Sequence, residues 1–539
     1  MAKKNLSPEE KTFKRNLFMF PIGTVGRDFL YNFFNGYLLT FILLTKNLTA
    51  AQFGSITIII VAARIFDALN DPIMGGIVEN TRSRFGKYKP WQLIGAVLTG
   101  VVIILLFNLP LQGWGFIGFL AVSYFMFSIT FSMNDISYWG MMPTLTSDAN
   151  KRNVLTSVTQ IFVSIGAGCA VILIPVLTTG AIGTKVFGSA TRAFGILAIV
   201  ASVIMVAFQL VTILGVKEKP LNLKLAKTKR LKLKDIFRVI LKNDQLLWAA
   251  VCLLLVNIGI GAYTSGLSTI YVYFEFGYDG MLTVLFAALY AVASVALTLF
   301  YPQLSKKYGR NKIMYFTTFL VMFGFLSMMF IGIFVPSFGE FSFNLFGSNL
   351  HLNGKFILLV IANFGIGAGG GYMIHTINIA NSVEYNEWKT GRREEGLIFS
   401  LRPLTNKMAS AISQGVVSLV YIIAGVIAFT NQISDKENYY ASKATLTEAE
   451  AAQKLSDIKS ILDAVPESSK NILLICMCLI PVVLLGISLI LYKKFFKLDE
   501  KKMLEINHDL QLRAEAENVA SSNEEQKQEI AESEEIAEK

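Results

Sequence analysis

Charged side chains interrupt a long apolar stretch of the sequence, VAARIFDALNDPIMGGIV. Arg64, Asp67 and Asp71 fall at positions i, i+3 and i+7, which lie on one face of a helix, and Asn70 lies beside them. Two carboxylates one helical turn apart repel each other unless a positive charge lies close to both. A bound sodium ion or a shared proton would supply that charge, and Arg64 would supply it in a purely structural cluster of ion pairs.

Further ionisable residues interrupt three other apolar stretches. Asp28 follows Arg27 in GRDFLYNFFNGY, and Asp135 precedes Trp139 by one helical turn in FSMNDISYWGMMPT. A carboxylate accepts hydrogen bonds from sugar hydroxyls, and an indole ring covers the apolar face of a sugar. The second pair is therefore a candidate sugar site, although Trp139 would serve equally well as a packing residue. In LRPLTNKMASAIS, Lys407 is placed to neutralise one of the carboxylates.

The stretches that carry these charges predict a membrane protein. Apolar residues make up 53% of the 539 residues and charged residues only 16%, whereas a soluble domain has about 25% charged residues. This composition excludes a disordered protein, a collagen, a disulfide scaffold and an ordinary soluble enzyme. A helix crosses a bilayer with about 20 apolar residues. Twelve stretches of this kind are predicted at 17–44, 52–78, 91–110, 114–141, 154–178, 192–215, 246–274, 280–302, 312–336, 354–382, 397–429 and 471–496.

The distribution of basic residues predicts the orientation of these helices. Lys and Arg cluster in segment 1–16 and after the second, fourth, eighth and tenth stretches, and they are scarce in the loops between. Cytoplasmic loops collect basic residues, so we expect both termini in the cytoplasm. The basic segment 216–245 separates two six-helix halves, 17–215 and 246–496. The predicted fold is thus an all-α integral membrane protein of the plasma membrane with the architecture of the major facilitator transporters.

Two polar segments lie outside the predicted helices. Residues 431–470 are expected to form a long outer loop with a short helix, and residues 497–539 an acidic cytoplasmic tail that is largely disordered. The net charge of +11 is explained by the cytoplasmic loops and does not require nucleic acid as a partner. Since the sequence contains no phosphate-binding loop, catalytic triad or zinc-ligand spacing, we expect neither an enzyme nor a cofactor, and no obligate protein partner.

Three longer motifs resemble those of the glycoside–pentoside–hexuronide cation symporters, the family that includes melibiose permease. In chain order they are ARIFDALNDPIMGGIVENTRSRFGKYKPW, NDISYWGMMPTLTSDANKR and SVEYNEWKTGRREEGLIFSLRPLTNKMASAI. The resemblance implies that a small sugar or glycoside enters the cell together with a sodium ion or a proton, by alternating access.

The resemblance also implies two neighbouring sites. The family's cation-binding positions correspond here to Asp67, Asn70, Asp71 and Ser132. Its sugar-binding positions correspond to Arg27, Asp28, Asp135, Trp139 and Gln160. The family's charge-balancing positions correspond to Arg64 and Lys407. At the position of Gln160 the family has an arginine that contacts sugar, so the sugar contacts of this chain are not fixed by the resemblance.

Two alternative functions remain open at this level. One is a major facilitator exporter or exchanger of a non-sugar solute, and the other is a membrane sensor that transports nothing. The sequence names neither the sugar nor the coupling ion. The amide oxygen of Asn70 favours sodium slightly, because a proton would not need this extra ligand.

Overall fold

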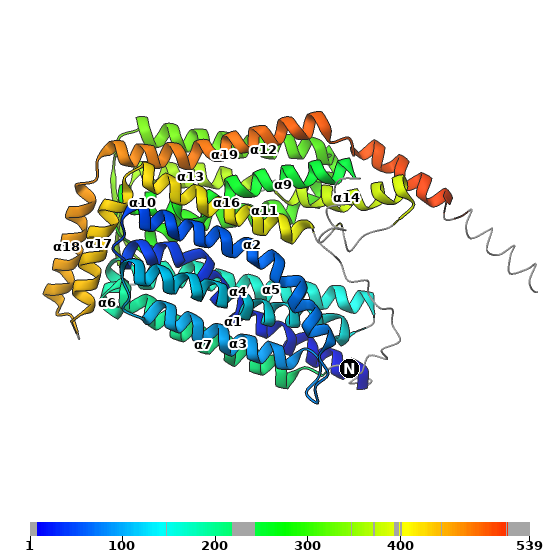
Figure 1. Ribbon diagram of the computed structural model, residues 1–539. Coiled ribbons are helices and arrows are strands. Elements are labelled where there is room, and N and C mark those ends of the chain that lie inside the picture. The colour runs from blue at the N-terminus through cyan, green and yellow to red at the C-terminus, as the bar shows by residue number, and fades with distance from the viewer. Residues whose placement is uncertain are drawn as a thin grey trace, which may run out of the picture.

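The computed structural model describes residues 8–146, 148–217, 243–345, 348–369, 372–392, 398, 401–443, 445–513 and 515. Two bundles of long helices lie side by side in this part of the chain (Figure 1). The N-terminal bundle contains α1 (Pro8–Thr45), α2 (Ala50–Asn80), α3 (Lys89–Asn108), α4 (Gly113–Leu145), α5 (Ala149–Thr178) and α7 (Ala190–Gly215). The short helix α6 (Gly180–Phe187) connects the last two of these.

The C-terminal bundle is built from the second half of the chain. Its helices are α9 (Asp244–Ala262), η1 (Tyr263–Leu267), α10 (Ser268–Phe276), α11 (Gly280–Tyr308), α12 (Arg310–Phe334), α13 (Gly354–Ala368), α14 (Tyr372–Thr390), α16 (Leu401–Ile423) and α19 (Glu467–Phe495). The three segments α9, η1 and α10 follow one another without a loop. Across the interface between the bundles, α16 packs against α2 and α11 packs against α5.

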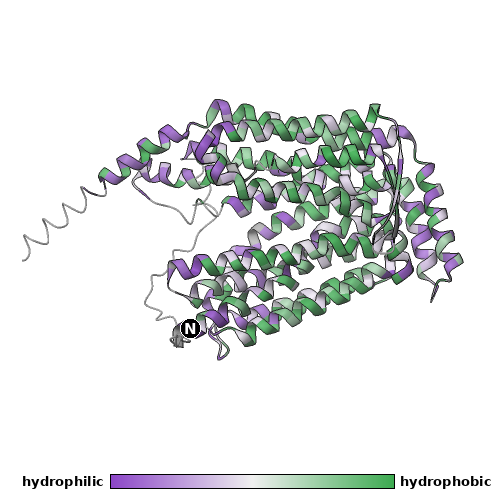
Figure 2. Ribbon diagram, turned by 180° about the vertical axis from the view of Figure 1, so that it is seen from behind, coloured by the Kyte–Doolittle hydropathy of each residue, from purple (hydrophilic) through white to green (hydrophobic). Residues whose placement is uncertain are grey.

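The hydropathy of the helices fits a bilayer environment. Nine helices in the described part of the chain are long and apolar enough to cross a membrane, and the bent pair of α16 and α17 (Val426–Ala441) would make a tenth. Figure 2 shows apolar residues along the bundles and polar residues gathered at their ends. Large apolar side chains such as Leu299 and Phe319 are 66% exposed, as expected where lipid replaces water around the helix. The count of twelve spans and the cytoplasmic position of the termini remain predictions.

Close packing fixes α1, the helix that carries Arg27 and Asp28. Gly26 lies directly against the backbone of α7, where an added Cβ would come within 2.8 Å of Met205 Cα. Further along α1, the rings of Phe33 and Phe107 pack with their centroids 4.7 Å apart. The helix therefore has little freedom to shift or rotate against its neighbours.

The predicted outer loop 431–470 is in fact a helical hairpin. Helix α16 ends at Ile423, and Gly425 adopts a left-handed conformation with φ of 67°, so that α17 leaves at 90° to α16. Helix α18 (Glu448–Asp463) returns alongside α17, and the two lie across one end of the bundles (Figure 1). The helix therefore ends about six residues before the predicted end of the span 397–429. The prediction was too long because the apolar run continues through a turn that glycine permits.

A buried ion pair inside this hairpin contacts the N-terminal bundle. Lys454 Nζ lies 2.8 Å from Glu437 Oε2, and both side chains are almost completely buried. Glu437 accepts a hydrogen bond from the amide of Ala190 (2.6 Å), and Lys454 donates to the carbonyl oxygen of Gly188 (3.0 Å). The hairpin thus joins the two bundles at the end of the molecule opposite to the N-terminus.

Two further segments differ from expectation. Strands were not predicted, yet β1 (Glu340–Leu345) and β2 (Ser348–Asn353) form an antiparallel pair between α12 and α13, outside the long helices. The acidic tail begins as a helix over residues 500–513, where Asp509 accepts a hydrogen bond from Trp388 (3.0 Å). Most of the basic segment 216–245, and the end of the tail, lie outside the described residues.

Candidate functional site

A cavity of about 270 Å³ lies between the two bundles and is bordered by α1, α2, α4, α5 and α16. We call it the first cavity. The predicted site residues that line it are Arg27, Asp28, Arg64, Asp67, Asp71, Ser132, Asp135, Trp139 and Lys407. The other lining residues are Tyr31, Phe127, Ser128, Phe131 and Val163. Helices far apart in the sequence therefore bring most of the predicted residues into one space.

Two serines of α4 meet the two carboxylates of α2. Ser132 donates a hydrogen bond to Asp71 Oδ1 at 2.8 Å, and Ser128 donates to Asp67 Oδ1. Each pair is one helical turn from the other, so the spacing of the acids on α2 is repeated by the hydroxyls on α4. Ser128 was not predicted, because its contact with Asp67 depends on how α4 packs against α2 and its spacing from Ser132 alone does not identify a partner.

Two basic side chains balance the same carboxylates. Arg64 Nη1 lies 3.8 Å from Asp67 Oδ2, and Arg64 also donates to Asn35 Oδ1. Lys407, from α16 of the C-terminal bundle, forms an ion pair with Asp71. Within the described residues, this is the one ion pair that connects the two bundles. The position of Asp71 is therefore linked to the separation of the bundles.

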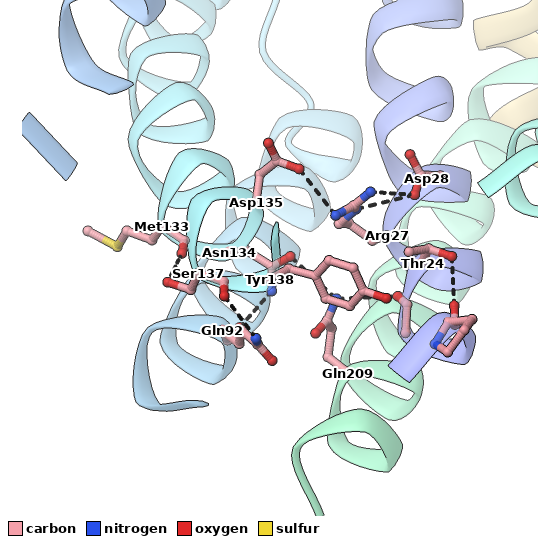
Figure 3. A network of polar contacts seen from close by, with 12 residues as sticks. Thr24, Arg27, Asp28, Gln92, Met133, Asn134, Asp135, Ser137, Tyr138 and Gln209 are labelled. Atoms are coloured by element: carbon pink, nitrogen blue, oxygen red, sulfur yellow. Dashed lines mark hydrogen bonds and ion pairs between the residues drawn. The ribbon is translucent and has the colours of Figure 1, made fainter. Parts of the chain in front are cut away.

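Arg27 lies between two further carboxylates, as Figure 3 shows. Its Nη2 contacts Asp28 Oδ2 at 2.8 Å, and its Nη1 contacts Asp135 Oδ1 at 3.2 Å. The guanidinium group also stacks over the rings of Tyr138 (4.7 Å) and Trp139 (5.2 Å). The side chain of Arg27 is 3% exposed and that of Asp135 is 40% exposed. Asp135 therefore presents carboxylate oxygen to the cavity, while Arg27 holds it in position.

Two predicted residues do not line the first cavity. Asn70 is buried on α2, and its Nδ2 has no hydrogen-bond partner in the described part of the chain. Gln160 is exposed on α5, one turn before Val163, which does reach the cavity. A cation contact by Asn70 and a sugar contact by Gln160 remain predictions from the resemblance.

The charges around the first cavity do not cancel. Its lining contains four carboxylates (Asp28, Asp67, Asp71, Asp135) and three bases (Arg27, Arg64, Lys407), so the formal charge is −1. In the described residues, no three His, Cys, Asp or Glu side chains gather as ligands of a metal ion. Two carboxylates with neighbouring hydroxyls are hard oxygen donors, which suit a single small cation or a proton better than a transition metal.

Comparison with known proteins places the sequence in a family. The sequence model of a family described as "MFS/sugar transport protein" matches residues 19–500. The chain belongs to that family. Its helices and its membership together make it a multi-pass protein of the plasma membrane. The resemblance to the glycoside–pentoside–hexuronide symporters is likewise confirmed.

Individual relatives in the family are carriers of sugars by name. This chain is 28% identical over 435 residues to the lactose permease of Leuconostoc lactis, and the match covers 77% of this chain and 64% of the permease. It is 30% identical over 421 residues to the raffinose carrier protein of Pediococcus pentosaceus, covering 76% of this chain and 62% of the carrier. The alignment thus spans less than two thirds of the length of both relatives.

The fold also matches a solved transporter structure. A bacterial homologue of the human lysosomal transporter Spinster, in an inward-facing and occupied conformation, superimposes with a TM-score of 0.55. The match covers 91% of this chain and 97% of the other at 12% identity, which establishes a shared fold and nothing about substrate.

Proposed function

We propose that this protein is a transporter that carries a sugar or glycoside into the cell together with one monovalent cation, by alternating access. The observation that carries the proposal is the first cavity, which holds two pairs of carboxylates. Asp28 and Asp135 lie around Arg27, and Asp67 and Asp71 lie beside two serine hydroxyls. Relatives named as a lactose permease and a raffinose carrier support a sugar as the substrate class. The formal charge of −1 supports a cation as the second substrate.

The sugar is bound by the cluster around Arg27. Asp135 and Asp28 accept hydrogen bonds from sugar hydroxyls, and charge-assisted bonds of this kind are stronger than neutral ones. Trp139 provides an apolar surface for the C–H face of the ring. Because Arg27 contacts both acids, it keeps their oxygens at a fixed separation before the sugar arrives.

The cation is bound by the Asp67–Asp71 pair and the two serine hydroxyls. In the absence of a cation, Arg64 and Lys407 compensate these acids. A cation at Asp71 competes with the ammonium group of Lys407. Binding of the cation therefore breaks the ion pair that connects the bundles. Occupancy of the ion site therefore alters how the bundles close around the sugar, and the coupling is reciprocal by linkage.

We infer that the cation is sodium. Ser128 and Ser132 supply uncharged oxygens beside the carboxylates, and sodium needs such ligands whereas a proton does not. The test is sugar binding to purified protein at pH 8, in sodium and in potassium salts. Sodium should tighten binding severalfold. Equal affinity in both salts, with tightening only as the pH falls, would establish proton coupling instead.

The decisive experiment for the whole proposal is uptake of labelled glycosides into proteoliposomes. An inward sodium gradient should drive accumulation above equilibrium, and collapse of the gradient should abolish it. Efflux against the gradient of a non-sugar solute would instead indicate an exporter, and the absence of any flux would indicate a sensor.

A further inference from the structure

A second cavity of about 500 Å³ adjoins the first and is lined mainly by neutral side chains. Tyr31 and Arg64 border both cavities, so the two spaces meet at these residues. Apart from Arg64, the described lining of the second cavity carries no charged side chain. Its volume lies within the range of pockets that hold small organic ligands, about 300–1,000 Å³.

The second cavity lies nearer to the hairpin end of the molecule. Along α1, Asp28 borders the first cavity, and Asn35 and Tyr37 border the second. Seven residues of helix separate Asp28 from Asn35, which corresponds to about 10 Å along the axis. A ligand held at Asp28 and Asp135 would therefore have to be longer than one small ring to occupy the second cavity as well.

The wall of this cavity in the C-terminal bundle is a broken helix. Between α9 and α10, η1 departs from regular α-helix, with Ser265 at φ −86° and ψ 17° and Gly266 at φ 139° and ψ −25°. The φ of 139° requires glycine at position 266, and the hydroxyl of Tyr421 would in addition lie 2.9 Å from a Cβ there. Non-helical backbone at membrane depth is tolerated where it lines a cavity, and substrate sites of transporters form at such breaks.

The break turns hydroxyl groups towards the cavity without using them in the fold. Ser265 and Ser268 line the cavity, and neither hydroxyl has a hydrogen-bond partner in the described part of the chain. By contrast, the neighbouring Tyr263 donates to Asn363 Oδ1 (2.7 Å), and Asn363 donates to the carbonyl of Phe286 (2.7 Å). Tyr263 and Asn363 thus hold the wall in place, while the hydroxyls of Ser265 and Ser268 are available to a ligand.

We infer that the second cavity is a subsite for the second ring of an oligosaccharide, with Ser265 and Ser268 as specificity-determining residues. This inference rests on the proposed function. The hydroxyls of a sugar ring would be matched by the neutral donors and acceptors of the cavity wall. The rings of Tyr31 and Tyr290 provide apolar surface for the C–H groups of the sugar. The first ring lies at the carboxylates of the N-terminal bundle, and the second ring contacts the unwound turn of the C-terminal bundle.

The test compares a one-ring and a two-ring ligand on the same variants. Binding of methyl β-galactoside and of lactose is measured on wild type and on the double variant Ser265→Ala/Ser268→Ala. The variant loses two neutral hydrogen bonds to the second ring, so affinity for lactose should fall about 10-fold. Affinity for the methyl galactoside should stay within about twofold, which also shows that the variant is folded.

A matched control is Thr298→Ala, an exposed hydroxyl of α11 that does not line the cavity. It should leave both affinities unchanged. An equal loss for both ligands, or no loss for lactose, would overturn the subsite assignment while leaving sugar transport intact. If wild type bound neither lactose nor raffinose but accumulated a one-ring glycoside in proteoliposomes, the subsite would be overturned and the proposed function would stand. The absence of flux for every glycoside tested would overturn both.

Discussion

The two bundles have similar architecture but contribute very different chemistry to the space between them. The N-terminal bundle supplies all four carboxylates of the first cavity, and the C-terminal bundle supplies one base, Lys407. In the second cavity, the C-terminal wall consists of neutral hydroxyl, amide and aromatic groups around the broken helix. The acidic groups are therefore confined to one half, and the other half contributes a single ammonium group to the first cavity.

This asymmetry predicts the largest effects for the acids of α2. Asp67→Asn or Asp71→Asn replaces a charged oxygen ligand by an amide, which should reduce sodium-driven accumulation at least ~100-fold, on the scale of about 3 kcal/mol for a charged hydrogen-bond partner. Insertion and folding should persist. Accumulation ratios in proteoliposomes measure the effect, with Asp499→Asn in the tail region as control. Normal concentrative uptake by either variant would disprove the ion-site assignment.

A somewhat smaller effect is expected for the sugar cluster. Asp135→Ala and Asp28→Ala each remove an acceptor for sugar hydroxyls, so sugar affinity should fall ~50-fold. For Asp28→Ala, sodium should still protect the protein against thermal unfolding, because α1 does not carry the paired acids. Unchanged sugar affinity would show that this part of the resemblance does not hold. Loss of sodium protection in Asp28→Ala would place Asp28 in the ion site.

Removal of the ammonium group tests the link between the bundles. Lys407→Ala frees Asp71 from its competitor, so sodium should bind more tightly, by roughly 10-fold. At the same time, the ratio of sugar affinities in sodium and potassium should approach one. Lys407→Arg keeps the charge and should retain part of the coupling. A variant in which the ratio of affinities is unchanged would contradict a coupling role for Lys407.

The smallest effect is expected at the serine that sequence analysis missed. Ser128→Ala removes one neutral ligand beside Asp67, and sodium affinity should fall about fivefold, as for one neutral hydrogen bond. Ser137→Ala is a suitable control, since that hydroxyl donates to Met133 of its own helix. Equal sodium affinity in both variants would exclude Ser128 from the ion site.

Helical spacing explains why part of the site was predictable. Arg64, Asp67 and Asp71 lie on one helix, so their common face follows from periodicity alone. Lys407 and the residues of the Arg27 cluster come from other helices, where they stand out as charges in apolar stretches, and only the resemblance implied that they share one site with the α2 acids. Ser128 depends on the register between α2 and α4, and no local pattern specifies that register.

Backbone breaks were the features that sequence patterns concealed. The apolar run 246–274 does not predict that the helix opens at Gly266, where a Cβ would meet the hydroxyl of Tyr421, a residue more than 150 positions later. The run 397–429 similarly conceals the turn at Gly425. Hydropathy reports which residues prefer lipid, and it is insensitive to a local change of backbone direction.

The hairpin of α17 and α18 has a consequence for how such a protein could be inhibited. Its chain ends belong to the C-terminal bundle, but Glu437 and Lys454 bond to the turn at Gly188 and Ala190 of the N-terminal bundle. If both termini are cytoplasmic, these contacts face the outside of the cell, and the alternating access proposed above requires them to break in every transport cycle. An antibody fragment that binds both the hairpin and the turn at Gly188 would stop transport from the cell surface, without competing with sugar for the cavity.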